Sequence, residues 1–269
     1  MSFDGHSAAQ SASRPVFDFK RFLSIADQIA PAFYERTWQM TLAHSSILFT
    51  DGLCICALCE MYEIDELVEA GTGCGGSAEM FARYFVEGRA VKRIRSVDLA
   101  DPIWARPLHW LRIRHRDPHV FSSRWAQRAA RERLSRFPNV ELIYGDASFK
   151  LPLIVRELTE RHARVGVFID GPKEAAQLGL AHELLGHSPL VRFAALDDVG
   201  PIFDGGGRYA RFRSSPYAAF ATSDHEFFDR YSWVNATRLP VRMARKPEHT
   251  GYGVGILINT EGRNSPGLF

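Results

Sequence analysis

The sequence predicts an α/β fold: a Rossmann-like, doubly wound, mostly parallel sheet with an antiparallel edge hairpin and an N-terminal helical cap. Five short apolar runs, most of them ending in an acidic residue, are expected to be strands. Helical stretches separate the later runs, and a glycine cluster follows the first one. Because parallel strands need crossover helices and are buried on both faces, this rhythm favours a doubly wound sheet. The five runs are residues 66–70, 94–98, 140–146, 165–170 and 191–198.

The composition predicts one soluble globular domain. The chain has 269 residues, of which 46% are hydrophobic and 24% charged, and this excludes collagen, a coiled coil and wholesale disorder. No apolar run approaches the roughly 18 to 20 residues of a membrane span. Residues 1–15 are small and polar without the pattern of a signal peptide, which predicts a disordered lead-in and a cytoplasmic location. Residues 16–269 are expected to form a single domain.

The first part of that domain, residues 16–64, is expected to form the helical cap. Apolar residues recur there at helical spacing, and Asp51 with Gly52 predicts a break between helices. The chain has four cysteines, and a spacing of two residues points the first two to different faces of a helix. Buried thiols are therefore favoured over a four-thiolate metal site. The cysteines are Cys54, Cys56, Cys59 and Cys74.

The strongest local signal is the segment EAGTGCGGS at residues 69–77, between the first strand and a helix. Glycines allow a tight turn and a close ligand approach, and a helix N-terminus offers N–H groups to an anion. The segment therefore predicts a nucleotide-type site. Gly71, Gly73 and Gly76 also fit Gly-x-Gly-x-x-Gly, with Asp98 where a ribose-binding acid would stand, so a dinucleotide site remains an alternative.

Two further features favour another cofactor. Glu69 stands two residues before the first glycine, and about sixty residues precede the strand, whereas dinucleotide domains usually begin close to theirs. The whole set resembles class I methyltransferases that use S-adenosylmethionine. The resemblance implies that Asp98 binds the ribose. It also implies a methionine-end set of Glu69, Gly71, Thr72, Gly73, Gly75 and Ser77, and an adenine set of Gly145, Asp146 and Ala147, with Asp170 added to the cofactor-binding residues.

A second group of polar residues follows the next two strands. Residues 168–173 read FIDGPK, and Asp197 and Asp198 end the following strand. Neighbouring parallel strands bring their C-terminal ends to one crevice, where gathered carboxylates favour a divalent cation. This pattern resembles the metal-dependent O-methyltransferases of the catechol and caffeoyl-CoA type and the macrocin-type sugar O-methyltransferases. The resemblance implies that Asp170, Asp197 and Asp198 hold Mg²⁺, with Lys173 and Asp170 as catalytic residues and Lys173 as the proton acceptor.

The main departure from those families is an inserted basic segment at about residues 100–137. It contains Trp104, Trp110 and a helix from about residue 123, and it is either a substrate lid or a solvated basic helix. The loop at residues 200–216 is expected to order over the acceptor. Two late strands, residues 237–244 and 253–259, are expected to form the antiparallel hairpin.

These observations predict an S-adenosylmethionine-dependent O-methyltransferase that acts, with a divalent cation, on a hydroxyl of a small molecule or sugar. One alternative is an NAD(P)-dependent oxidoreductase. The other is a catalytically silent cofactor-binding or RNA-binding module, since 12 arginines lie between residues 89 and 136 beside Trp104, Trp110 and Trp125. Nucleic acid and membrane partners are disfavoured, and homo-oligomerisation is left open.

Overall fold

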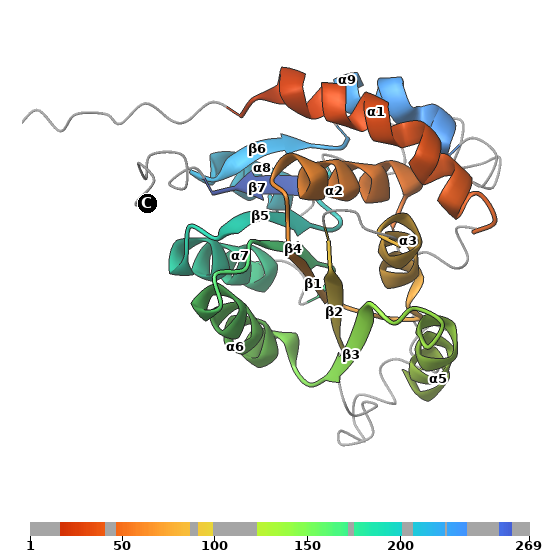
Figure 1. Ribbon diagram of the computed structural model, residues 1–269. Helices are drawn as coiled ribbons and strands as arrows, with labels where there is room; N and C mark the ends of the chain where they lie inside the picture. The colour runs from red at the N-terminus through yellow and green to blue at the C-terminus, as the bar shows by residue number, and fades with distance from the viewer. Residues whose placement is uncertain are drawn as a thin grey trace, which may run out of the picture.

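The computed structural model is a seven-stranded sheet with helices on both faces (Figure 1). It describes residues 17–40, 47–86, 91–98, 123–171, 175–200, 207–223, 225–235 and 253–259. The strands are β1 Glu66–Ala70, β2 Arg93–Asp98, β3 Val140–Tyr144, β4 Val165–Ile169, β5 Val191–Leu196, β6 Ala218–Ala221 and β7 Gly255–Ile258. The α-helices are α1 Phe19–Thr37, α2 Phe49–Met61, α3 Gly76–Tyr84, α5 Ser123–Leu134, α6 Ala147–Glu160, α7 Ala175–His187, α8 Arg208–Ser214 and α9 His225–Tyr231, followed by the 3₁₀ turn η5 Ser232–Val234.

The strand order is β3-β2-β1-β4-β5-β7-β6. Strands β1 to β5 pair in parallel, and β7 runs antiparallel to both β5 and β6. This arrangement confirms the predicted doubly wound, mostly parallel sheet with antiparallel pairing at one edge. The partner of β7 is β6, whereas the expected strand at residues 237–244 lies outside the described part of the chain.

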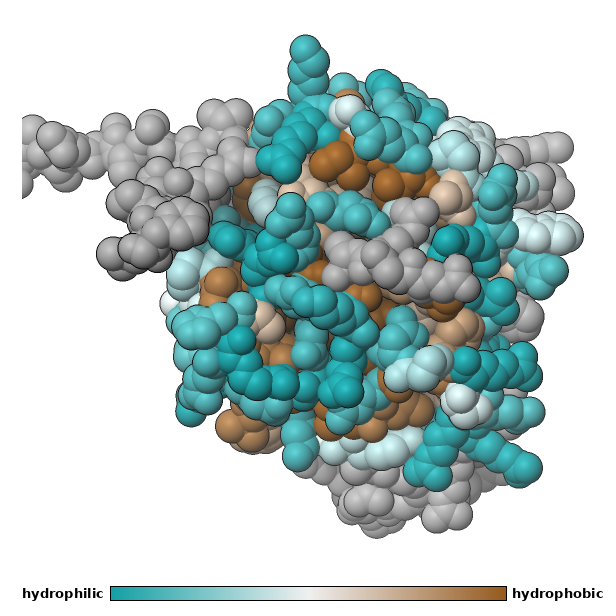
Figure 2. All heavy atoms as spheres, in the orientation of Figure 1, coloured by the Kyte–Doolittle hydropathy of each residue, from teal (hydrophilic) through white to brown (hydrophobic). Residues whose placement is uncertain are grey.

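Alternation along the central strands divides the interior into two hydrophobic cores. Phe168 of β4 packs with α1, α2 and α3, while its neighbours Val167 and Ile169 pack with α6 and α7. Successive strand residues point to opposite faces, so each central strand serves both layers. The surface seen in Figure 2 is mainly hydrophilic, with hydrophobic residues showing between hydrophilic ones.

Helix α2 corrects the predicted break at Asp51 and Gly52, because both residues lie inside its first turn. Gly52 is buried, and a Cβ atom there would lie 2.1 Å from the sulfur of Met80 in α3. The glycine therefore permits α2 and α3 to pack closely. In the sequence, a glycine with this role looks the same as a glycine that breaks a helix. Among the described helices, none is long and apolar enough to cross a membrane.

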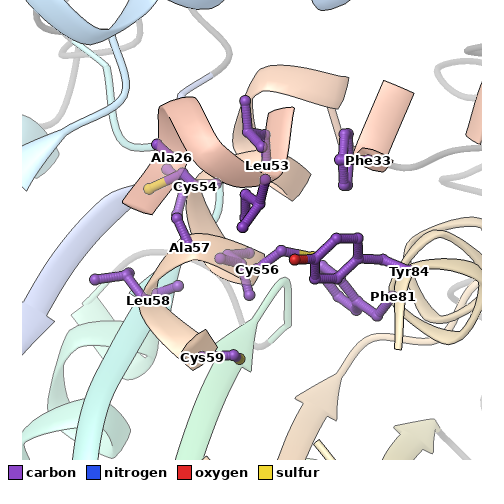
Figure 3. Packing of buried hydrophobic residues seen from close by; sticks show 14 of the residues in the cluster. Ala26, Phe33, Leu53, Cys54, Cys56, Ala57, Leu58, Cys59, Phe81 and Tyr84 are labelled. Atoms are coloured by element: carbon purple, nitrogen blue, oxygen red, sulfur yellow. The ribbon is translucent and has the colours of Figure 1, made fainter. Parts of the chain in front are cut away.

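The cysteines of α2 are packing residues. Cys54, Cys56 and Cys59 are fully buried, and Figure 3 shows their side chains leaving the helix in different directions among Ala26, Phe81 and other apolar groups. Burial raises the pKa of the Cys54 and Cys59 thiols well above the usual range. Their burial confirms the preference for buried thiols at these three positions, whereas Cys74 is half-buried.

The C-terminal third departs from the sequence prediction at two elements. Residues 208–214, expected to belong to a loop, form α8, whose Phe212 is buried against Val199 and Gly255. The short strand β6 was not expected, since its sequence AAFA has no long apolar run. Residues 201–206 of the expected loop lie outside the described residues.

A buried arginine, Arg95, lies between the sheet and α6. Arg95 of β2 is 6% exposed, and its Nε donates to Glu66 of β1 at 2.8 Å. The same guanidinium lies 3.6 Å from Glu141 of β3 and 3.5 Å from Glu157 of α6. One cation therefore compensates carboxylates from three elements, and its removal would leave Glu66 largely buried without its closest partner.

We expect Arg95→Met to destabilise the fold by about 3 kcal/mol, because it leaves the largely buried Glu66 carboxylate without its closest partner. Arg93→Met is the matched control on the same strand, because the Arg93 side chain is 51% exposed and its pair with Glu141 is 3.6 Å long. The control should change stability by no more than about 1 kcal/mol. Urea denaturation followed by circular dichroism measures both, and equal losses would contradict the assignment.

Candidate functional site

The glycine segment forms a tight loop between β1 and α3. Gly71, Gly73 and Gly75 have φ values of 97°, 51° and 78°, in the left-handed region that favours glycine. The Gly71 N–H donates to the carbonyl of Val97 at 2.9 Å. A Cβ atom at Gly71 would lie 3.1 Å from Cβ of Asp170, so the loop passes directly beside the end of β4.

Glu69 holds this loop in place through hydrogen bonds in the interior of the fold. Its side chain is fully buried, and its two carboxylate oxygens accept hydrogen bonds from the hydroxyls of Ser77 and Ser96. The hydroxyl of Thr72 lies 2.6 Å from that of Ser96, which extends the network into the loop. Glu69 thus joins β1, β2 and the first turn of α3. Direct contact of Glu69 and Ser77 with a cofactor stays a prediction.

Burial raises the pKa of Glu69 to about 7. The hydrogen bonds from Ser77 and Ser96 lower that pKa, and the nearby carboxylates of Asp170 and Asp98 raise it. The buried carboxyl group therefore keeps its proton to a higher pH than an exposed glutamate does.

Asp98 forms one wall of a pocket beside the loop. Its Oδ2 accepts from the Gly73 N–H at 3.1 Å, and its carbonyl accepts from the Gly145 N–H at 2.8 Å. The pocket has a volume of about 200 Å³ when the adjoining space that is open to solvent is counted with it. It is lined by Thr72, Gly73, Asp98, Gln127, Ala130, Leu142, Ile143 and Tyr144. The structure thus places three of the predicted cofactor residues, Thr72, Gly73 and Asp98, around one space.

Sequence reasoning missed the opposite wall of this pocket. Gln127 and Ala130 belong to α5, the end of the segment that was expected to be a lid or a solvated helix. A signal was present, because Ala129 and Ala130 interrupt the run of arginines and small side chains allow close packing. A Cβ atom at Gly75 would lie 3.3 Å from the Cα of Ala130, which shows how closely α5 covers the loop.

The predicted adenine residues follow the pocket along the chain. Gly145 has a φ of 153° and succeeds Tyr144 directly. Asp146 is the N-cap of α6, since its Oδ1 accepts from the Ser148 N–H at 2.9 Å. Ala147 is the first residue of that helix. The segment therefore has a structural role as a helix start, and its contact with an adenine ring stays a prediction.

The three aspartates predicted to hold Mg²⁺ directly follow β4 and β5. Asp170 raises the pKa of Glu69 in β1, whereas Asp198 raises that of Asp51 in α2. Asp197 is only 6% exposed. Among the described residues, no group of three His, Cys, Asp or Glu side chains is already arranged around a metal position. Binding of Mg²⁺ by these carboxylates stays a prediction.

Lys173, predicted to accept the proton, lies outside the described residues. Gln177 of α7 holds together the ends of β4 and β5. Its side-chain amide donates to the carbonyl of Ile169 at 2.5 Å and to that of Asp197 at 3.2 Å. The carboxyl ends of β4 and β5 are thus fixed beside each other.

The strand order is that of a Rossmann-like, doubly wound sheet, with β7 antiparallel between β5 and β6. No protein-family model matches the chain, and no curated protein matches its sequence. Among solved structures, an O-methyltransferase from Bacillus cereus in complex with SAH is 14% identical over 87% of this chain and 90% of its own, with a TM-score of 0.40. The O-methyltransferase TomG from Streptomyces achromogenes, in complex with SAM, is 16% identical over 88% of this chain and 90% of its own, also with a TM-score of 0.40.

We expect Gly75→Ala to destabilise the protein by about 1–3 kcal/mol, the usual cost of a left-handed backbone for a residue with a Cβ atom. The new methyl group would also lie 3.1 Å from Cδ1 of Leu134. Gly179→Ala in α7 is the control, since Gly179 is exposed and a Cβ atom there would have no neighbour within 4 Å. The control should gain about 0.5–1 kcal/mol. Thermal unfolding that gave both variants the same sign would contradict this account.

Glu69→Gln should change how stability depends on pH. An unfolded glutamate releases its proton near pH 4.5, whereas folded Glu69, with its pKa at about 7, retains it. The folded wild type therefore binds one more proton in this window, and its stability should fall relative to the variant as pH rises from 4.5 to 7. Urea denaturation at a series of pH values measures the difference. A difference that is constant across the window would disprove the raised pKa.

Proposed function

We propose that this protein is an S-adenosylmethionine-dependent O-methyltransferase. The observation that carries the proposal is the pocket where the loop after β1, Asp98 after β2 and the end of β3 meet. Ligands of open α/β sheets bind at the carboxyl ends of strands, beside the point where the strand order reverses. Asp98 supplies a carboxylate for ribose hydroxyls, and the glycine loop lets a ligand approach the backbone closely.

The sheet topology supports a methyltransferase over the NAD(P)-dependent alternative. The usual dinucleotide-binding sheet is mostly parallel and has the order 3-2-1-4-5-6, with no later strand inserted before the sixth. Here β7 stands between β5 and β6 and runs against both. The Gly-x-Gly-x-x-Gly spacing of Gly71, Gly73 and Gly76 is common to both interpretations and does not discriminate between them.

The proposed reaction breaks the bond between the sulfonium and its methyl group and forms a bond between that carbon and the acceptor oxygen. The products are a methyl ether, S-adenosylhomocysteine and a proton from the acceptor hydroxyl. Because the methyl group is already activated, the protein mainly positions the two reactants in line. The carboxyl ends of β4 and β5 are the proposed acceptor region, because Asp170 after β4 lies beside Gly71 of the cofactor loop. Lys173 as proton acceptor is part of this proposal.

The contacts of α5 count against the RNA-binding alternative. Arg133 lies 3.2 Å from Glu79 of α3, and Arg131 donates to the hydroxyl of Tyr144 at 2.8 Å. These two arginines make intramolecular contacts that hold α5 beside the pocket. The tryptophans Trp104 and Trp110 lie outside the described residues.

Isothermal titration calorimetry tests the cofactor. Wild-type protein should bind S-adenosylhomocysteine, and Asp98→Ala should weaken binding by about 10-fold or more, as expected for loss of hydrogen bonds to a charged group. Asp229→Ala removes an exposed carboxylate on α9 and should bind as the wild type does. Binding of NAD together with no heat from S-adenosylhomocysteine would reject the proposal in favour of an oxidoreductase.

The divalent cation remains a part of the proposal that rests on the resemblance alone, and no step above depends on it. A panel of small hydroxyl compounds and sugars, assayed for S-adenosylhomocysteine release, identifies an acceptor. If a cation at Asp170, Asp197 and Asp198 takes part, a chelator should abolish transfer and Mg²⁺ or Mn²⁺ should restore it. Full activity in excess chelator after dialysis would reject the cation and leave the methyltransferase proposal intact.

A further inference from the structure

Helix α5 is fixed beside the cofactor loop by three separate contacts, two with α3 and one with β3. Its Ala130 and Leu134 form a small hydrophobic cluster with Ala78 of α3. Arg133 pairs with Glu79, whose side chain is only 10% exposed and also holds Arg83 at 2.8 Å. A helix held at several points presents its remaining side chains in defined positions.

The third contact joins α5 to the far end of the pocket. The Nε of Arg131 donates to the hydroxyl of Tyr144 at 2.8 Å, and its guanidinium carbon lies 5.1 Å from the centre of the Tyr144 ring. Tyr144 is the last residue of β3 and lines the pocket. Arg131 therefore keeps the tyrosine and the helix together as one wall.

Gln127 lies one turn before Ala130 and lines the same pocket. Most of the lining is apolar or backbone, from Gly73, Ala130, Leu142 and Ile143. Among the pocket-lining side chains, Asp98 provides a carboxylate and Gln127 an amide. An ionised carboxylate only accepts hydrogen bonds, whereas the amide of glutamine both donates and accepts.

We infer that Gln127 is a cofactor-binding residue that recognises the nucleoside half of the ligand from the wall opposite Asp98. This inference rests on the proposed function. A nucleoside has an apolar ring face that suits the apolar lining, together with hydroxyl and ring nitrogen groups that both donate and accept. A mostly apolar pocket in which Asp98 supplies an acceptor and Gln127 a group that donates and accepts suits such a ligand. The end of the inserted segment is thus part of the cofactor site.

Gln127→Met tests the inference, because methionine keeps the length of the side chain and loses the amide. We expect S-adenosylhomocysteine binding to weaken about 3- to 10-fold, which corresponds to one neutral hydrogen bond. Adenosine lacks the amino-acid half of the ligand, so its binding should weaken by the same factor. Arg128→Met is the control, since Arg128 is exposed on the same helix and does not line the pocket.

The outcomes separate the two proposals. If the wild type binds S-adenosylhomocysteine, Asp98→Ala weakens it and Gln127→Met does not, the role of Gln127 is overturned and the proposed function stands. A loss for S-adenosylhomocysteine without a loss for adenosine would place the contact on the amino-acid half and overturn the nucleoside assignment. If the wild type binds neither ligand, the proposed function fails. Thermal unfolding of Gln127→Met checks that its fold is unchanged.

Discussion

A single buried carboxyl group, that of Glu69, organises the candidate site. The strand β1 turns its odd-numbered positions toward α3, which places Glu69 under the loop and within reach of Ser77 and Ser96. A buried polar group is costly unless its hydrogen bonds are satisfied, and here both oxygens are occupied. The loop geometry, the start of α3 and the position of β2 therefore depend on one another. Removing any member of this network would leave a buried group without its partner.

The parallel part of the sheet was predictable because each strand carries its own signal. Four short apolar runs that end in an acidic residue, and one that ends at the glycine cluster, are visible in the sequence, and these five became β1 to β5. The glycine loop was predictable for the same reason, since positive φ values at Gly71, Gly73 and Gly75 restrict the residue type. In these places the local sequence alone determines the local structure.

The parts that were missed depend on partners distant in sequence. The strand β6 has only four residues, AAFA, and becomes a strand through its pairing with β7. Gly52 reads as a helix breaker and in fact lets α2 approach Met80. Gln127 lies in an arginine-rich helix, and the packing of α5 against Gly75 and α3 brings it to the pocket. Spacing along the chain does not reveal which face of α5 meets the loop.

The helical cap and the C-terminal strands are joined through a second buried polar group, the carboxyl group of Asp51. Asp51 of α2 is fully buried, and its carboxylate accepts from the Thr222 hydroxyl at 2.5 Å. Thr222 in turn accepts from the Val254 N–H at 2.8 Å, directly before β7. The first turn of α2 is therefore attached to the ends of β6 and β7, although 171 residues separate Asp51 from Thr222. The charge of Asp198 raises the pKa of Asp51, and the Val199 N–H donates to the carbonyl of Gly253 at 2.8 Å. The cap is therefore tied to the chain that follows β5, just as α5 packs on the loop that follows β1. Both segments outside the central strand–helix repeat are thus fixed at the carboxyl ends of the parallel strands.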